Sequence, residues 1–96
     1  MIDFLKDYGI KNETIDELNN KYFDSMLFNI NNNELEIAKI INYFKTLGIT
    51  CIDELLIENT ELFLLTFDEV KTKITKYDIN KLAESLNQDY HVIYQI

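Results

Sequence analysis

The sequence contains no proline, no tryptophan and no arginine, and it has a single cysteine and a single histidine. One cysteine, Cys51, cannot form an intrachain disulfide, which fits a protein of a reducing cytosol. One histidine, His91, cannot supply a histidine-dependent triad or a multi-histidine metal site. There is also no Cys-x-x-Cys pair and no calcium-binding loop. The sequence therefore predicts neither an enzyme nor a resident metal or cofactor.

The charge balance is strongly acidic. All nine basic residues are lysines and they face 17 carboxylates, which gives a formal net charge of −8. This charge repels phosphate and argues against generic nucleic-acid binding. No apolar run approaches the roughly 20 residues of a membrane-spanning helix, and the amino terminus does not resemble a secretory signal. We expect a cytoplasmic protein without a membrane partner, and the abundance of Ile, Asn and Lys suggests an AT-rich bacterial genome.

An internal repeat emerges when the chain is shifted by 39 positions. The shift places Phe4 over Tyr43, Lys6 over Lys45, Gly9 over Gly48 and Ile10 over Ile49. A second shift gives a weaker third copy, in which Asn87 takes the place of Gly48. Gly, and less often Asn, adopts positive φ at the end of a helix at low cost, so helices should end at these three positions. The predicted units span about 2–40, 41–79 and, in part, 80–96.

Each stop is followed by a shared phrase, Ile-Asp-Glu-Leu, at 15–18 and again at 52–55. Ile52, Leu55 and Leu56 lie on one face of a helix, which predicts a short amphipathic helix. An apolar turn over 60–65 follows, with a looser match at 26–28.

Two capping boxes predict where the long helices begin. In each, a polar residue precedes a glutamate by three positions, namely Asn31 with Glu34 and Thr66 with Glu69. They predict helices over 31–47 and 66–86. The predicted core faces are Ile37, Ile40, Ile41, Phe44 and Leu47 in the first helix, and Val70, Ile74, Tyr77, Leu82 and Leu86 in the second. The sequence therefore predicts an all-α, solenoid-like domain of about two and a half helical repeats, with about six or seven helices.

This pattern resembles the mitochondrial transcription termination factor family over residues 2–88. The matching positions are Leu47, Gly48, Ile49, Ile52, Leu55, Leu56, Leu65 and Val70. The resemblance implies repeats stacked into a curved solenoid, whose concave face grips duplex nucleic acid in several members. The sequence departs from the family at Thr60, where a proline is common, and it lacks a basic groove and the full number of repeats.

Charge is uneven along the chain. Residues 34–70 hold eight carboxylates and two lysines, whereas residues 71–96 hold four lysines and three carboxylates. The carboxylates can simply be solvated helix faces, or they can form an acidic ridge that meets a basic partner or imitates the charge spacing of DNA. The four lysines offer a phosphate contact as a further alternative. The ridge residues are Asp53, Glu54, Glu58, Glu61, Asp68 and Glu69.

The six phenylalanines are expected in the core, and Cys51 is expected to be a small buried hydrophobic residue. The tail over 89–96 breaks the helical period and is rich in aromatic and β-branched residues, which predicts an extended segment. Such a tail can cap the exposed end of the stack, or it can contact a partner or a second copy of the chain. Its candidate contact residues are Tyr90, His91 and Tyr94.

These observations favour a cytosolic interaction module that binds, and can regulate, a protein partner. The partner would meet the acidic face or the carboxy-terminal end, and the same end could form a homodimer. Two alternatives are a nucleic-acid-binding module of the termination-factor type and an acidic inhibitor that mimics DNA.

Overall fold

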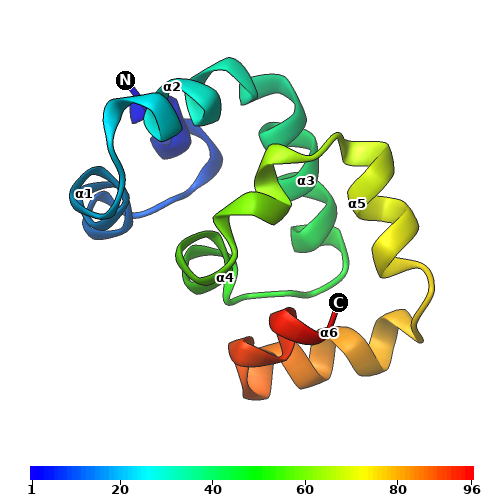
Figure 1. Cartoon of the computed structure of the whole chain (residues 1–96). Helices are drawn as coiled ribbons and strands as arrows, with labels where there is room; N and C mark the ends of the chain where they lie inside the picture. The colour runs from blue at the N-terminus through cyan, green and yellow to red at the C-terminus, as the bar shows by residue number, and fades with distance from the viewer.

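The computed structural model describes residues 1–96 as an all-helical chain without strands, as predicted (Figure 1). Its six α-helices and three short 3-10 helices slightly exceed the predicted number. None of them combines the length and the apolar character needed to cross a membrane. In chain order the elements are η1 (Asp3–Tyr8), α1 (Asn12–Lys21), α2 (Asp24–Asn32), α3 (Glu34–Thr46), α4 (Ile52–Glu58), η2 (Thr60–Leu64), α5 (Phe67–Ile74), α6 (Ile79–Gln88) and η3 (Tyr90–Gln95).

Two of the three predicted helix stops are confirmed. Gly9 and Gly48 have φ of +90° and +81°, respectively, at the ends of η1 and α3. The third prediction is wrong, because Asn87 lies within α6 and no residue other than glycine has positive φ. The Asn87 side chain has a different role. It donates to the Gly48 carbonyl and accepts from the Thr50 amide, both at 2.8 Å, and so ties α6 to the loop after α3.

Gly48 provides a test of backbone strain without a steric clash. A Cβ added at this position would meet no atom within 4 Å, so only the left-handed backbone opposes a side chain. We expect Gly48→Val to lower the free energy of unfolding by about 1–2 kcal/mol in urea titrations. Gly48→Asn is the matched control and should cost less, because asparagine enters this region more readily. If both variants lost the same free energy of unfolding, backbone strain at this position would not explain the loss.

The predicted helix over 66–86 is wrong as a single element. Its first part, α5, ends at Ile74, and a new helix, α6, begins after Asp78. The Asp78 carboxylate accepts a hydrogen bond of 3.2 Å from the Lys81 amide, so aspartate acts here as an N-cap inside the apolar pattern. The break turns Tyr77 outward, and this predicted core residue is exposed.

One of the two predicted capping boxes is confirmed. Thr66 Oγ1 accepts from the Glu69 amide at 3.2 Å, and the Glu69 carboxylate accepts from the Thr66 amide at 3.0 Å. The second of these bonds is the main cause of a lowered pKa at Glu69. The other box is wrong, because Asn31 lies inside α2 and α3 begins after Asn33. Asn33 instead donates its amide to the Phe63 carbonyl of η2 at 2.8 Å.

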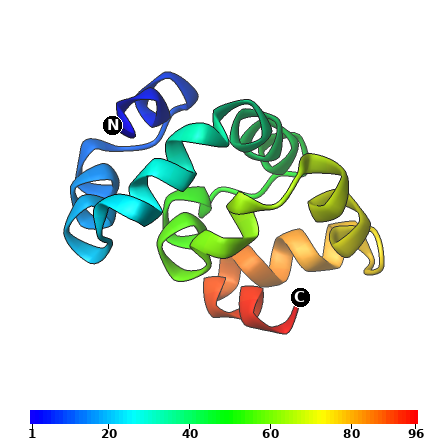
Figure 2. The same ribbon diagram turned by 45° about the horizontal axis from the view of Figure 1, so that its top comes forward.

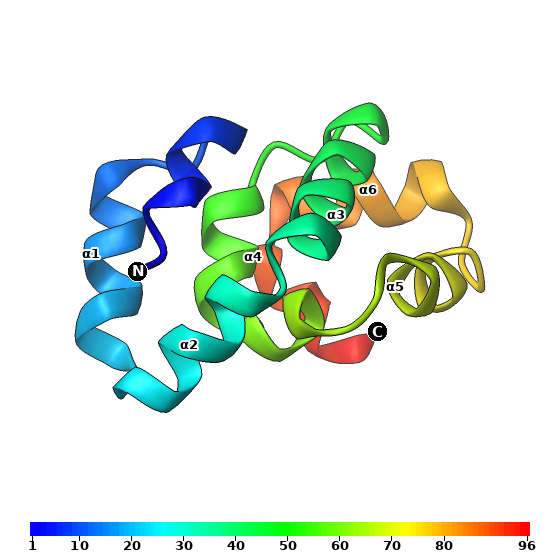
Figure 3. The same cartoon turned by 90° about the horizontal axis from the view of Figure 1, so that it is seen from above.

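Three elements, α1, α4 and η3, lie in one row across the molecule. Figure 3 shows α1 and α4 side by side, and α4 in turn contacts η3. Figure 2 shows η3, in red, beside α6, which it also contacts. The prediction of an extended tail is therefore wrong in shape. With three residues per turn, a 3-10 helix brings Tyr90, Ile93 and Ile96 to one face, and Ile93 is only 1% exposed. The tail packs on α4 and α6 of its own chain, and its contact with a partner or a second copy stays a prediction.

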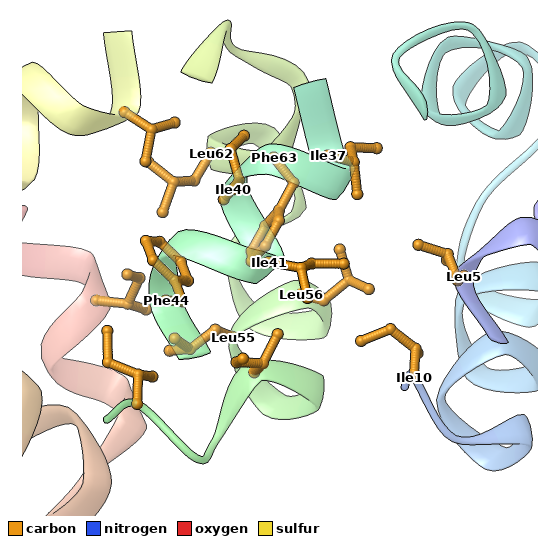
Figure 4. Packing of buried hydrophobic residues seen from close by; sticks show 14 of the residues in the cluster. Leu5, Ile10, Ile37, Ile40, Ile41, Phe44, Leu55, Leu56, Leu62 and Phe63 are labelled. Atoms are coloured by element: carbon orange, nitrogen blue, oxygen red, sulfur yellow. The ribbon is translucent and has the colours of Figure 1, made fainter. Parts of the chain in front are cut away.

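The core centres on α3, α4 and η2 (Figure 4). Phe44 and Phe63 are fully buried and meet edge to face, with ring centroids 5.8 Å apart. Leu5 and Ile10 approach the same core from the amino-terminal segment. Phe23 and Phe28 are corrections to the predicted core, since they are 89% and 56% exposed at the start and on the outer face of α2.

Several side-chain hydrogen bonds between the elements join residues 37–39 positions apart, whereas others span as few as 18 or as many as 42 residues. The Lys45 ammonium donates to the Tyr8 carbonyl, 37 residues away, and the Thr14 hydroxyl donates to Asp53, 39 residues away. The Tyr22 hydroxyl reaches Thr60 across 38 residues, and the bond from Asn87 to Gly48 spans 39. These values match the 39-residue shift of the sequence pattern.

Candidate functional site

Asp53, the first of the predicted ridge residues, is engaged inside the molecule. Its carboxylate accepts from the Lys11 amide at 2.9 Å and from the Thr14 hydroxyl at 2.7 Å. Both donors belong to the start of α1, so this carboxylate holds the amino-terminal end of one helix against its neighbour. Asp53 is therefore half-buried between α1 and α4.

Four of the predicted site residues come together at the carboxy-terminal edge. The Tyr94 hydroxyl of η3 donates to the carboxylate of Glu58 at the end of α4, and this bond is the main cause of a raised pKa at Tyr94. The His91 ring lies 4.4 Å from the Tyr90 ring and 6.3 Å from the Tyr94 ring, centroid to centroid. The result is an acidic and aromatic edge formed by Glu58, Tyr90, His91 and Tyr94.

A histidine–carboxylate pair extends this edge. His91 Nδ1 lies 2.9 Å from Asp89 Oδ1, and the same oxygen accepts from the His91 amide. The hydrogen bond with the His91 side chain is the main cause of a lowered pKa at Asp89. Both side chains are exposed, so the pair starts η3 without forming a closed site.

The remaining ridge residues do not join this edge as one cluster. Glu54 is exposed on α4 and makes no side-chain hydrogen bond. Glu61 lies in a hollow between η2 and Ile96, and Asp68 lies in another along α5. Lys73 lines both of these hollows, so it offsets part of their negative charge. The structure thus spreads the predicted ridge over several surfaces.

A hollow of about 290 Å³ lies at the surface where α6 and η3 meet. Leu82, Val92 and Ile96 provide apolar walls, and Lys81 and Ser85 lie at its border. The volume is close to the lower limit of small-molecule pockets. The Tyr77 hydroxyl closes one side by donating to the Gln95 carbonyl at 3.0 Å.

Two further features concern Cys51 and the grouping of metal-ligating side chains. The Cys51 thiol donates to the Leu86 carbonyl at 3.3 Å, and burial is the main cause of its raised pKa. A raised pKa keeps a thiol protonated and unreactive. No group of three or more His, Cys, Asp or Glu side chains lies close enough to hold a metal ion.

Sequence reasoning missed two residues of this region. Tyr77 was assigned to the core, yet its hydroxyl fastens η3. Asp78 was not recognised as a helix start, although an aspartate three positions before Lys81 is a typical N-cap signal. A helix start at Asp78 would have ended the apolar helix pattern before Tyr77, so the sequence would not have placed Tyr77 in the core.

The chain matches no known protein family, and no significant similarity links it to a curated protein or to a solved structure. Its function must therefore be inferred from its own geometry and charge.

Proposed function

We propose that this protein is an acidic helical-repeat module of the cytosol that binds a basic region of a protein partner and regulates it. The observation that carries the proposal is how few of the carboxylates are neutralised within the molecule. Among 17 carboxylates, only Glu36 forms a salt bridge with a lysine, Lys39, and Asp89 is the only one paired with the His91 ring. The other carboxylates have no cationic partner within the molecule, although some accept hydrogen bonds, so their charge can attract a positively charged surface.

The subset of inter-element hydrogen bonds that spans 37–39 residues supports the repeat arrangement. In a stack of repeats, each residue neighbours its counterpart one period away. The residues around Gly9 are held by Lys45, at the Tyr8 carbonyl, and by Asp53, at the Lys11 amide. The loop after Gly48 is held by the Asn87 side chain and by the bond from the Cys51 thiol to the Leu86 carbonyl. In both loops the held amide lies two residues after the glycine. These parallels also support the likeness to the termination-factor family, which remains part of the proposal.

The position of Glu54 and Glu61 makes the proposal testable. Both are exposed and neither makes a hydrogen bond, so lysine substitutions should leave the fold intact. Immobilised protein would be exposed to an extract of the source cell, and the retained partner would be quantified at increasing salt. We expect Glu54→Lys with Glu61→Lys to reduce retention about tenfold, since reversing surface charges opposes electrostatic association. High salt should weaken retention by the unmodified protein.

Glu17→Lys with Glu84→Lys is the matched control. It makes the same charge change at exposed positions of α1 and α6 and should alter retention less than twofold, as about 0.4 kcal/mol would. If both variants lost retention equally, the effect would depend on net charge alone, and binding of the partner at Glu54 and Glu61 would be contradicted.

A gel shift with duplex DNA and RNA tests the nucleic-acid alternative. At physiological salt we expect no binding at micromolar protein, because the chain carries −8 and has no arginine. A complex whose affinity falls steeply with salt would favour the termination-factor type of function instead.

A further inference from the structure

The segment over residues 90–96, named the strap here, is joined to the rest of the fold through a single extended residue. Asp89 both ends α6 and begins η3, with φ of −151° and ψ of 102°. The strap contacts α4 and α6, and Ile93 is its one fully buried side chain. A single turn or two of 3-10 helix has poor hydrogen-bond geometry, so these tertiary contacts hold the strap in place.

The strap is fastened by the two exposed tyrosines of the chain. Tyr94, 60% exposed, donates to Glu58, and Tyr77, 43% exposed, donates to the Gln95 carbonyl. The hydrogen bond from the Tyr22 hydroxyl to Thr60 is better sheltered from water, because Thr60 is buried. Exposed hydrogen bonds compete with water and add little stability. The strap is thus fastened more weakly than the units inside the stack.

The packing around Ile96 is incomplete on both sides. Ile96 lines the hollow of about 290 Å³ beside α6 and a second hollow of about 250 Å³ beside η2. Leu82 provides an apolar wall in the first, and Leu62 and Leu65 do so in the second. If the strap moved away, these two spaces would join into one groove with apolar walls. The strap itself, a short helical segment, occupies this groove in the structure.

We propose that the strap is an autoinhibitory segment and that the groove beneath it is the docking site for a short segment of a protein partner. The partner segment would imitate the strap, with apolar side chains at every third position in place of Tyr90, Ile93 and Ile96. A basic residue next to them would face Glu58, whose carboxylate loses the Tyr94 hydroxyl when the strap leaves. The proposal rests on the proposed function, since it identifies where such a partner docks.

Hydrogen exchange tests whether the tyrosines fasten the strap. In Tyr77→Phe with Tyr94→Phe, amide exchange at Val92 and Ile96 should accelerate about tenfold, as expected when two surface hydrogen bonds are lost. The amides of α1 should keep their rates. Tyr43→Phe is the matched control, because the Tyr43 hydroxyl makes no hydrogen bond, and it should leave the strap unchanged. Unchanged exchange in the double variant would overturn the fastening role.

A fluorescent peptide with the sequence of residues 88–96 tests the groove. The unmodified chain should bind it weakly, because its own strap occupies the site. The Tyr94→Phe variant, which leaves the groove residues unchanged, should bind it about threefold more tightly, since apparent affinity rises with the fraction of open molecules. The same peptide with Ile93→Ser should not bind. Equal binding of both peptides, or no binding of either at millimolar concentration, would overturn the docking site. Glu61 lines the second hollow, so Glu54→Lys alone, which lies in neither hollow, separates the two proposals. It should reduce retention of the partner and leave peptide binding unchanged.

Discussion

Replacing Phe44 with alanine should lower the free energy of unfolding by about 3–5 kcal/mol, the range for removing a buried aromatic ring. Phe44 is fully buried, and its ring meets Phe63 edge to face at 5.8 Å. A domain of this size has a total stability of about 5–15 kcal/mol, so the variant should be at best marginally folded. In urea unfolding followed by circular dichroism, the midpoint should fall by about 2 M.

Phe28→Ala is the matched control for this prediction. It removes the same ring from the exposed face of α2, where the side chain is 56% accessible. Its effect should stay within about 0.5 kcal/mol, as for most surface substitutions. A loss at Phe28 comparable to that at Phe44 would mean that α2 is covered by a further surface, such as a second copy of the chain. Sedimentation would then detect the association.

The parts of the fold that the sequence predicts best are those in which local signals agree. Helical spacing and the glycine stop both define α3, and its predicted face of Ile37, Ile40, Ile41 and Phe44 is buried. The Thr66–Glu69 capping box likewise combines two reciprocal bonds within four residues. Such elements depend on neighbours in sequence, so a single chain contains the information needed to locate them.

Two of the errors arise where a side chain bonds an element far away in sequence. Asn87 aligns with the glycine stops, yet its side chain stabilises the loop after α3 and needs no left-handed backbone. Asn33 likewise reaches η2 and replaces the expected cap at Asn31. A carboxamide can donate and accept at once, so the residue type alone does not reveal which partner it has.

The candidate site shows the same limit. Glu58 and Tyr94 were both predicted as contact residues, but on separate surfaces. The structure joins them across 36 residues of sequence. Their pairing depends on η3 occupying the place beside α4, and the irregular pattern of the tail gives no helical period from which that place could be predicted. Tertiary contacts decide such a segment, as they decide the ends of many helices.

The second large effect is expected from deleting residues 89–96. The deletion removes Ile93, which is 1% exposed, and uncovers apolar surface on α4 and α6. Full burial of one such side chain is worth about 1.5–3 kcal/mol, and the partly buried residues of the strap add to it. The melting temperature should fall by about 10–20 °C, given roughly 4–8 °C per kcal/mol in a domain of this size. Far-UV circular dichroism should still show a helical protein.

Melting temperature and sedimentation together interpret this deletion. A less stable monomer is the expected result, because in the unmodified chain the strap covers apolar surface on α4 and α6 of the same molecule. A dimer that becomes an intact, equally helical monomer would instead assign the strap to an interface between two copies. His91→Ala is the control, since this side chain is exposed and its removal should shift the melting temperature by only a few degrees, about 0.5 kcal/mol or less. If the deletion moves neither quantity, the strap does not cover the groove between α4 and α6, and its autoinhibitory role is lost with it.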